Sequence, residues 1–199
     1  MSRKLTLALA AAIAFNLSAP VVAQGYSEGF KFLEAVRKRD GGSAESSLAG
    51  GGSRLVNTKD LTSGETGLHI VTRDRDLLWL RCLLSKGAKA DVENKRGETP
   101  LTLATQLGWV DGAAVLLRAG AKVDGANSRG ETPLILAVHK RDVPMIRLLL
   151  ANGANPQRND IIAGYSALDY AKRDDRSGTI VKLLEEPQPA KAVVAGPAR

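Results

Sequence analysis

The chain has 199 residues and a net charge of +7, and 44% of its residues are hydrophobic although only 4% are aromatic. Any core must therefore be aliphatic and assembled from small side chains. Cys82 is the only cysteine, which excludes an intramolecular disulfide framework.

The N-terminus has the pattern of a secretory signal peptide. Arg3 and Lys4 precede an apolar run over residues 5–15, and small residues follow up to Ala23. This run is too short to span a bilayer as a helix of the mature protein. We expect cleavage after Ala23, which would remove residues 1–23. No cysteine lies nearby to carry a lipid anchor, so we expect an exported protein without membrane insertion after cleavage.

Residues 26–38 predict an amphipathic helix, because four apolar side chains recur there at helical spacing: Phe30, Phe32, Leu33 and Val36. The next segment is irregular and includes Gly-Gly-Gly-Ser at 50–53. We interpret it as a degenerate second helix with a longer loop. It lacks the lysine and the strand-to-helix context of a phosphate-binding loop.

An eight-residue string recurs through the rest of the chain. GETPLTLA at 97–104 returns 33 residues later as GETPLILA at 130–137. GETGLHIV stands one period earlier, at 64–71, and GYSALDYA follows at 164–171 after one extra residue. A fixed period in this range is the sequence signature of a solenoid.

The second half of each unit also repeats, as a Leu-rich run that ends in Gly-Ala: RCLLSKGA at 81–88, AVLLRAGA at 114–121 and RLLLANGA at 147–154. In the best-formed unit, Thr99 is expected to cap a first helix whose first residue is Pro100. Gly120 stands where a helix ends in the left-handed conformation. Helices of about eight to ten residues cannot bury a core alone, so the pairs must stack on their neighbours.

These landmarks resemble the ankyrin repeat, whose hallmark is T-P-L-H-x-A followed by a helix that ends L-L-x-x-G-A. The resemblance implies an all-α fold: an ankyrin-repeat solenoid of stacked helix-turn-helix units with short β-hairpin-like loops. We expect this domain over residues 24–186, in about five units of which the first and last are degenerate caps. A disordered tail is expected over 187–199, after Pro187 stops the last helix. With the N-terminal signal, the resemblance indicates a bacterial protein that is periplasmic or secreted.

Three residues invite separate expectations. Trp79 occupies a second-helix slot that Met145 occupies later, so we expect Trp79 in the core. Trp109 stands at the break between two helices and is expected to be partly exposed. Cys82 shares its slot with Val115 and Leu148, which predicts a small buried apolar residue rather than a reactive thiol.

No catalytic or metal-binding pattern is present in the sequence. Two histidines and one cysteine supply too few ligands for a zinc site, and no nucleophile stands in a recognisable motif. His69 falls on the histidine of the resemblance, whose role is structural, since its ring bonds the backbone of the neighbouring unit. We expect no enzyme and no cofactor. An enzyme with an unrecognised carboxylate site is the weakest alternative.

The resemblance also indicates where a partner would bind. Ankyrin proteins usually bind partners through the hairpin tips and the exposed positions of each first helix, which together line a concave face. Carried over position by position, these slots hold Arg73, Lys95, Arg96, Glu98, Gln106, Arg129, Glu131, His139, Lys140 and Tyr165.

The charge balance narrows the class of partner. After cleavage the chain would keep 26 of its 28 basic residues against 21 acidic ones, a net charge of about +5. Nucleic-acid readers show a denser basic stripe and stacking aromatics, so a mixed-charge groove fits an acidic protein loop or tail better. We therefore expect a monomeric, non-catalytic protein–protein interaction module, an adaptor or modulator of an envelope partner protein. The alternative is an exported effector or toxin-like protein that acts on a host or a competitor.

Overall fold

The computed structural model describes residues 21–174 and 178–186. Within these ranges the regular structure is helical, apart from one β-bridge between Asn159 and Ser166. No helix among the described residues is long and apolar enough to cross a membrane. The helices are α1 (Val21–Lys38), α2 (Gly41–Val56), α3 (Gly67–Arg73), α4 (Leu77–Ser85), α5 (Pro100–Leu107), α6 (Val110–Arg118), α7 (Pro133–His139), α8 (Val143–Ala151), α9 (Ala167–Asp174) and α10 (Thr179–Glu185).

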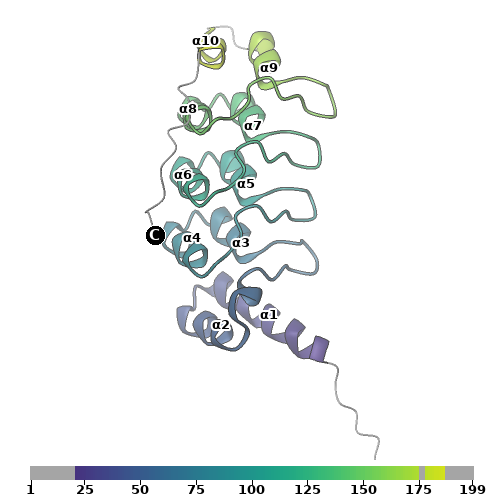
Figure 1. The fold of residues 1–199 in the computed structure, drawn as a ribbon, viewed down its shortest axis with the longest axis vertical. Coiled ribbons are helices and arrows are strands. Elements are labelled where there is room, and N and C mark those ends of the chain that lie inside the picture. The colour runs from purple at the N-terminus through teal and green to yellow at the C-terminus, as the bar shows by residue number, and fades with distance from the viewer. Residues whose placement is uncertain (1–20, 175–177, 187–199) are drawn as a thin grey trace, which may run out of the picture.

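Consecutive helices pair, and the pairs stack in chain order (Figure 1). The second helices, α4, α6, α8 and α10, form one column, and the first helices, α3, α5, α7 and α9, form the column beside it. The loops before the first helices all project to the same side, away from the second-helix column. The expected fold is confirmed: an all-α solenoid of helix-turn-helix units with hairpin-like loops.

The first helices begin where the repeated string predicts. The side chain of Thr99 accepts a hydrogen bond from the backbone N–H of Thr102 at 3.2 Å, and Pro100 follows as the first helical residue. Thr132 and Pro133 repeat this arrangement one unit later. Each cap satisfies a helix N–H that would otherwise lack a partner, which is worth about 1 kcal/mol.

The core is a ladder of aliphatic side chains repeated at the same positions in successive units. Leu68, Leu101 and Leu134 from the first helices are buried, as are Leu116 and Leu149 from the second helices. Burying one leucine stabilises the fold by roughly 1.5–3 kcal/mol, so no single pair could fold alone but the stack can.

The projecting loops touch one another through glycine. Gly64, Gly97 and Gly130 have positive φ angles, and a Cβ on Gly97 would lie 2.6 Å from the backbone nitrogen of Ser128 in the next loop. At the same contact, Ser128 N–H donates to the carbonyl oxygen of Arg96 at 3.2 Å. The repeated glycine is therefore required both by its conformation and by the close approach of the next loop.

The turns between paired helices use a second left-handed position. Gly108 has φ 66°, and three arginines adopt the same conformation in other units: Arg39, Arg75 and Arg141. Left-handed φ is unfavourable for such residues, so a compensating contact is expected. Arg75 Nη2 donates to the carbonyl oxygen of Leu107 at 2.5 Å, which ends the first helix of the next unit. Arg141 makes the equivalent bond to Asp174 at 2.7 Å.

The interpretation of the N-terminal unit needs a correction. The glycine run at 50–53 is not a loop, because α2 continues through it to Val56 and bends at Gly52, whose φ is 60°. Asp40 caps this helix by accepting from the N–H of Ser43 at 3.0 Å. The expected signal peptide over 1–23 lies outside the described residues except that α1 begins at Val21. The expected tail over 187–199 also lies outside them.

The expectation for Trp109 was wrong, because this residue is buried, with 9% of its surface exposed. Trp79 packs against the core as expected but is only partly buried. The reason for the burial of Trp109 is an exchange of volume, because Gly112 occupies the slot that Trp79 and Met145 fill elsewhere. A Cβ on Gly112 would overlap the Trp109 ring, so the indole covers this glycine. The expectation that Cys82 is buried was also wrong, since this cysteine is exposed.

Candidate binding groove

Two rows of side chains face each other along the stack. One row comes from the residue after the loop glycine, and the other from the last turn of the first helix, eight positions later. The rows pair in register: Glu65 with Arg73, Glu98 with Gln106, Glu131 with His139, and Tyr165 with Arg173. In each unit, the pair lies on the concave side, with one residue on the loop and the other on the first helix.

The first pair is an ion pair. Arg73 Nη1 donates to Glu65 Oε2 at 3.0 Å, and Arg73 Nη2 donates to Oε1. The hydrogen bond from Arg73 lowers the pKa of the largely buried Glu65 carboxyl, and the same bond raises the pKa of Arg73. Arg73 lies on the predicted face, but its charge is already neutralised within its own unit.

Glu98 organises the second loop from beneath it. Its carboxylate accepts from Asn94 Nδ2 at 2.8 Å, Arg96 Nε at 2.9 Å and Gln106 Nε2 at 3.2 Å. Burial raises the pKa of Glu98, but these hydrogen bonds outweigh it and keep the pKa below its ordinary value. Glu98 is buried, so of this predicted group only Arg96 and part of Gln106 face solvent.

Lys95 joins two neighbouring loops. Its Nζ donates to the carbonyl oxygen of Leu61 at 2.7 Å, and its backbone N–H donates to the carbonyl oxygen of Ser63 at 3.0 Å. The side chain is exposed at the loop tips. Lys95 therefore stabilises the loop stack as well as contributing charge to the predicted face.

The fourth unit, which contains α7 and α8, opens a hollow beside the first helices. Five of the predicted residues meet there with Leu136 around a volume of about 490 Å³: Gln106, Arg129, Glu131, His139 and Lys140. Arg129 Nη2 donates to Glu131 at 2.6 Å, which holds the arginine at the rim. His139 and Lys140 are exposed at the end of α7. The hollow offers cations, one carboxylate and an apolar floor.

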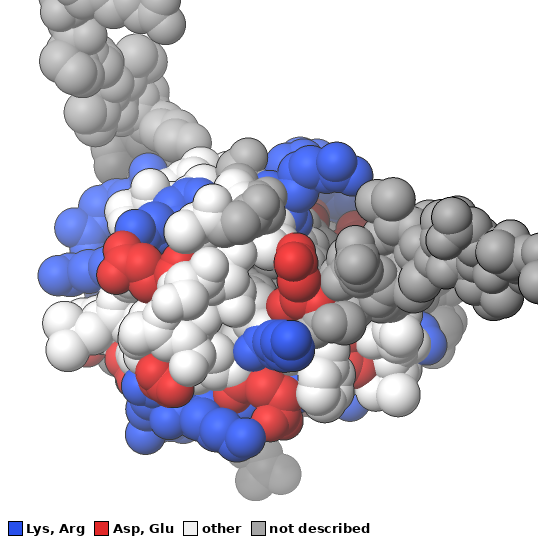
Figure 2. All heavy atoms as spheres, turned by 90° about the horizontal axis from the view of Figure 1, so that it is seen from below, with Lys and Arg blue, Asp and Glu red and all other residues white. Residues whose placement is uncertain are grey.

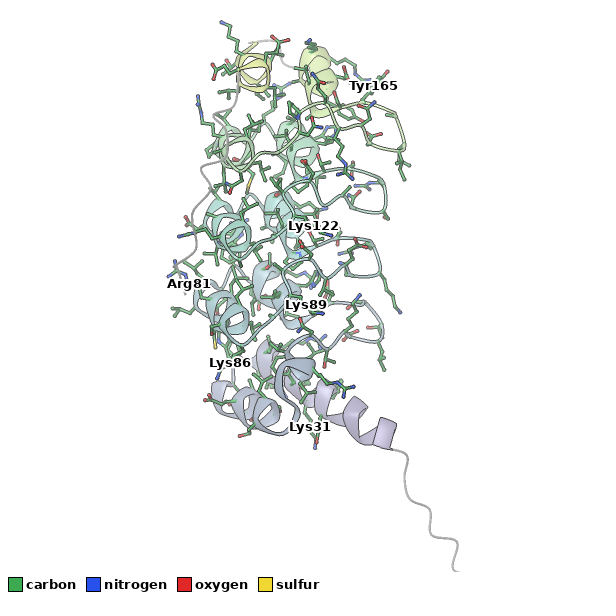
Figure 3. All side chains as sticks on the ribbon, viewed as in Figure 1. Lys31, Arg81, Lys86, Lys89, Lys122 and Tyr165 are labelled. Atoms are coloured by element: carbon green, nitrogen blue, oxygen red, sulfur yellow. The ribbon has the colours of Figure 1, made fainter. Side chains whose placement is uncertain are left out.

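The last unit replaces the glutamate with an aromatic residue. Tyr165, which is 41% exposed, lies with its ring 5.4 Å from the guanidinium carbon of Arg173 (Figure 3). Tyr170 packs between Tyr165 and His139, with ring centroids 5.5 Å and 4.3 Å apart respectively. The Tyr170 hydroxyl donates to Asp160 at 2.6 Å.

This hydrogen bond fixes the aromatic cluster. The bond to Asp160 raises the pKa of Tyr170 to about 12, so its hydroxyl stays a donor. Burial raises the pKa of Asp160, but the bonds from Tyr170 and three loop amides outweigh it and lower that pKa. The one extra residue of the final loop is accommodated here, because Asp160 Oδ1 accepts hydrogen bonds from three backbone amides of the longer turn.

A second hollow lies on the other side of His139. It has a volume of about 270 Å³ and is lined by Val138, His139, Arg141, Arg173 and Asp174. Arg141 and Tyr170 were not among the predicted site residues. Their slots differ from those of the unit before, since Arg141, like Arg75, stands where that unit has Gly108, and Tyr170 replaces Leu103 and Leu136. These two exchanges are the signals that could have found them.

Charge is mixed rather than concentrated. Figure 2 views the molecule along its length from the end that carries α1 and α2, and there the blue groups of Lys and Arg are interrupted by red Asp and Glu. No group of three or more His, Cys, Asp or Glu side chains within the described ranges could hold a metal ion. On the concave side, the residues that line the two hollows offer hydrogen bonds, cations and apolar edges for recognition.

A comparison with known families agrees with this geometry. A family model described as ankyrin repeats (3 copies) matches residues 32–127 and again residues 116–192. The two matches overlap and together span the helix stack from α1 to α10.

Proposed function

The chain belongs to the ankyrin repeat family, and we propose that it uses its concave side to bind another protein as an adaptor or modulator. Ankyrin repeats are generally protein–protein interaction modules, and their domains are typically non-catalytic. The repeat stack offers a preformed surface, so binding would not carry the cost of ordering a flexible chain.

The observation that carries the proposal is the hollow of the fourth unit. Loop and helix residues far apart in sequence meet there, and Arg129 and Lys140 present cations above the apolar side chain of Leu136. Polar groups at a rim around an apolar floor are typical of protein interfaces. All ten residues of the predicted face lie on the loops or first helices, although Glu98 serves its own loop from below.

The cellular setting is a proposal from the N-terminal pattern. The charged start, short apolar run and small-residue exit support export and cleavage after Ala23. We place the mature protein in the bacterial periplasm or outside the cell, acting as a monomer on a protein partner rather than on nucleic acid. The interrupted charge pattern supports a protein partner, because nucleic-acid readers carry denser basic surfaces.

Affinity capture tests the proposal. The purified chain from Gln24 onward serves as bait for periplasmic extract, beside a variant with Lys95→Glu and Lys140→Glu on the two halves of the groove. The matched control carries Lys89→Glu and Lys122→Glu, the same charge change at exposed lysines on the connecting segments (Figure 3). Circular dichroism verifies that all baits keep their helical content.

A protein retained by the native bait and the control, but lost by the groove variant, would support the proposal. Equal retention by all three baits would contradict binding through the concave side. Failure to retain any protein would contradict an envelope partner and favour the alternative, an exported effector whose target lies in a host or competitor.

A further inference from the structure

We propose that the C-terminal half of the groove binds an acidic segment of the partner, with a carboxylate between Arg141 and Arg173 and an apolar side chain against Tyr165. This inference rests on the proposed function, because it names the chemistry of the partner at the same concave side. The protein-binding function and the preference for an acidic segment can fail separately, because they are tested with different variants.

The register of the paired rows shows an uncompensated cation in the last unit. Glu65 neutralises Arg73 through two hydrogen bonds, whereas the slot of Glu65 is occupied by Tyr165 in front of Arg173. Among the described residues, Arg173 has an ion pair with the adjacent Asp174 at 3.8 Å, and both side chains are more than half exposed. Such a pair contributes little, so Arg173 remains available to an external carboxylate.

Arg141 supplies a second guanidinium to the same hollow of about 270 Å³. The bond from Arg141 to the carbonyl oxygen of Asp174 occupies one donor and fixes the side chain, while a guanidinium has five donors. Two arginines that line one small hollow fit a carboxylate, which accepts two parallel hydrogen bonds from a guanidinium.

The apolar part of the proposed site lies next to Arg173. Tyr165 is 41% exposed and held edge-on against Tyr170, and the final loop also exposes Ile161 and Ile162. Ile162 is 73% exposed, which leaves its side chain open to a partner. Tyrosine and arginine side chains at rigid positions are the residue types that most often dominate protein binding energy.

Charge complementarity selects an acidic partner. The two hollows on either side of His139 carry four cations, Arg129, Lys140, Arg141 and Arg173, against the carboxylates of Glu131 and Asp174. Arg129 is paired with Glu131, as Arg73 and Arg96 are paired with Glu65 and Glu98 in the N-terminal half. The cations left to face an acidic partner in the C-terminal half are therefore Lys140, Arg141 and Arg173.

A selection from random 12-residue peptides displayed on phage, with the purified chain as target, tests this chemistry. We expect enrichment of Asp or Glu next to Phe, Leu or Trp. The enriched peptide is then labelled with fluorescein, and its affinity is measured by fluorescence anisotropy. Arg173→Glu and Tyr165→Ser should each weaken binding by about tenfold or more. Arg81→Glu, the same charge change on the second-helix side of the molecule, should leave the affinity unchanged (Figure 3).

Three results would overturn the inference. Enrichment of basic or uncharged peptides, or none at all, would remove its chemical basis. Equal affinity of Arg173→Glu and Arg81→Glu for an acidic peptide would place that peptide elsewhere. Tighter binding of a fluorescein-labelled single-stranded DNA, lost in Arg173→Glu, would identify a nucleic-acid site instead. If peptide binding is lost only in Lys95→Glu, the chain still binds protein and the proposed function survives.

Discussion

The imidazole of His69 donates from Nε2 to the backbone carbonyl oxygen of Glu98, 2.9 Å away in the next unit. The backbone N–H of Thr66 donates to Nδ1 at 3.2 Å, so the proton of the neutral ring must lie on Nε2. His69 is fully buried. The structural role expected for this histidine is confirmed, and one side chain joins the first helix of one unit to the loop of the next.

The residues in the same slot of later units do not make this link. Thr102 bonds to Thr99, and Asp169 bonds to Ser166, both within their own units. Ile135 has no polar side chain. Besides the buried aliphatic core, the polar links between later units therefore come from the loop backbones and from Arg141 rather than from a histidine.

The first prediction concerns pH. Burial lowers the pKa of His69 below its ordinary value of 6.5, although the bond to Glu98 opposes this shift. As pH falls through 6.5, the unfolded chain takes up a proton that the folded chain still refuses, so stability falls. Urea unfolding should give a lower free energy of unfolding at pH 5.5 than at pH 7.5. His69→Thr, which introduces the residue that Thr102 provides in the same slot, should remove most of this difference.

The carboxyl groups of Glu65 and Glu98 affect stability in a different pH range from His69. Glu65 and Glu98 also have lowered pKa values, but their contribution is lost only at more acidic pH, as they are protonated. If His69→Thr keeps the full loss between pH 7.5 and 5.5, another group is responsible and the assignment to His69 is wrong.

The second prediction concerns the loop glycines. Gly97→Ala places a left-handed alanine, at φ 69°, with its Cβ 2.6 Å from the Ser128 nitrogen. Gly120→Ala has φ 89° but meets nothing within 4 Å. The free energy of unfolding of the control, Gly120→Ala, should therefore fall by about 1–2 kcal/mol, the cost of a left-handed alanine. That of Gly97→Ala should fall by clearly more. Equal losses in thermal or urea unfolding would show that the loops do not require close approach.

The third prediction concerns the volume exchange at Trp109. Gly112→Ala should destabilise the protein by about 1–3 kcal/mol, because its Cβ would overlap the indole. In a Trp109→Asp background, which restores the aspartate cap of Asp76 and Asp142, the same change should instead stabilise by about 1 kcal/mol through helix propensity. A destabilising effect of similar size in both backgrounds would refute the exchange.

The fourth prediction concerns Cys82. This exposed side chain lines a hollow of about 320 Å³ between α2 and α4, together with Leu48 and Trp79. Native protein should react with Ellman's reagent without prior unfolding, at a rate within about tenfold of that in 6 M guanidinium chloride. If Cys82 reacts only after the protein is unfolded, its side chain is buried and the prediction is wrong.

Local rules explain how much of the fold could be predicted. Thr99, Pro100 and Gly120 act on their own backbone and on residues within one turn, so the sequence alone located helix starts and stops. The 33-residue period then determined that the units stack, because a short helix pair must bury its apolar face on a neighbour. The ten candidate binding residues came from the resemblance to ankyrin repeats, carried over position by position in the same register.

Which side chains are buried and which face solvent was decided by the tertiary structure. Trp109 fills the space left by Gly112, so a residue at a helix break became core. Trp79 is only partly buried, and Cys82 is exposed. Glu98 turned inward because Asn94, Arg96 and Gln106 converge on it only after the loop folds onto its helix.

The same division holds for the groove. The sequence by itself determined a repeat protein, because the period and the helix caps depend on residues close together in the chain. The resemblance to ankyrin repeats implied that loops and first helices share one side. Only the tertiary structure brought Arg141, Arg173 and His139 around one hollow, since these side chains come from two different units. Their meeting depends on how α7 and α9 pack, and packing is set by contacts between units rather than by any local pattern.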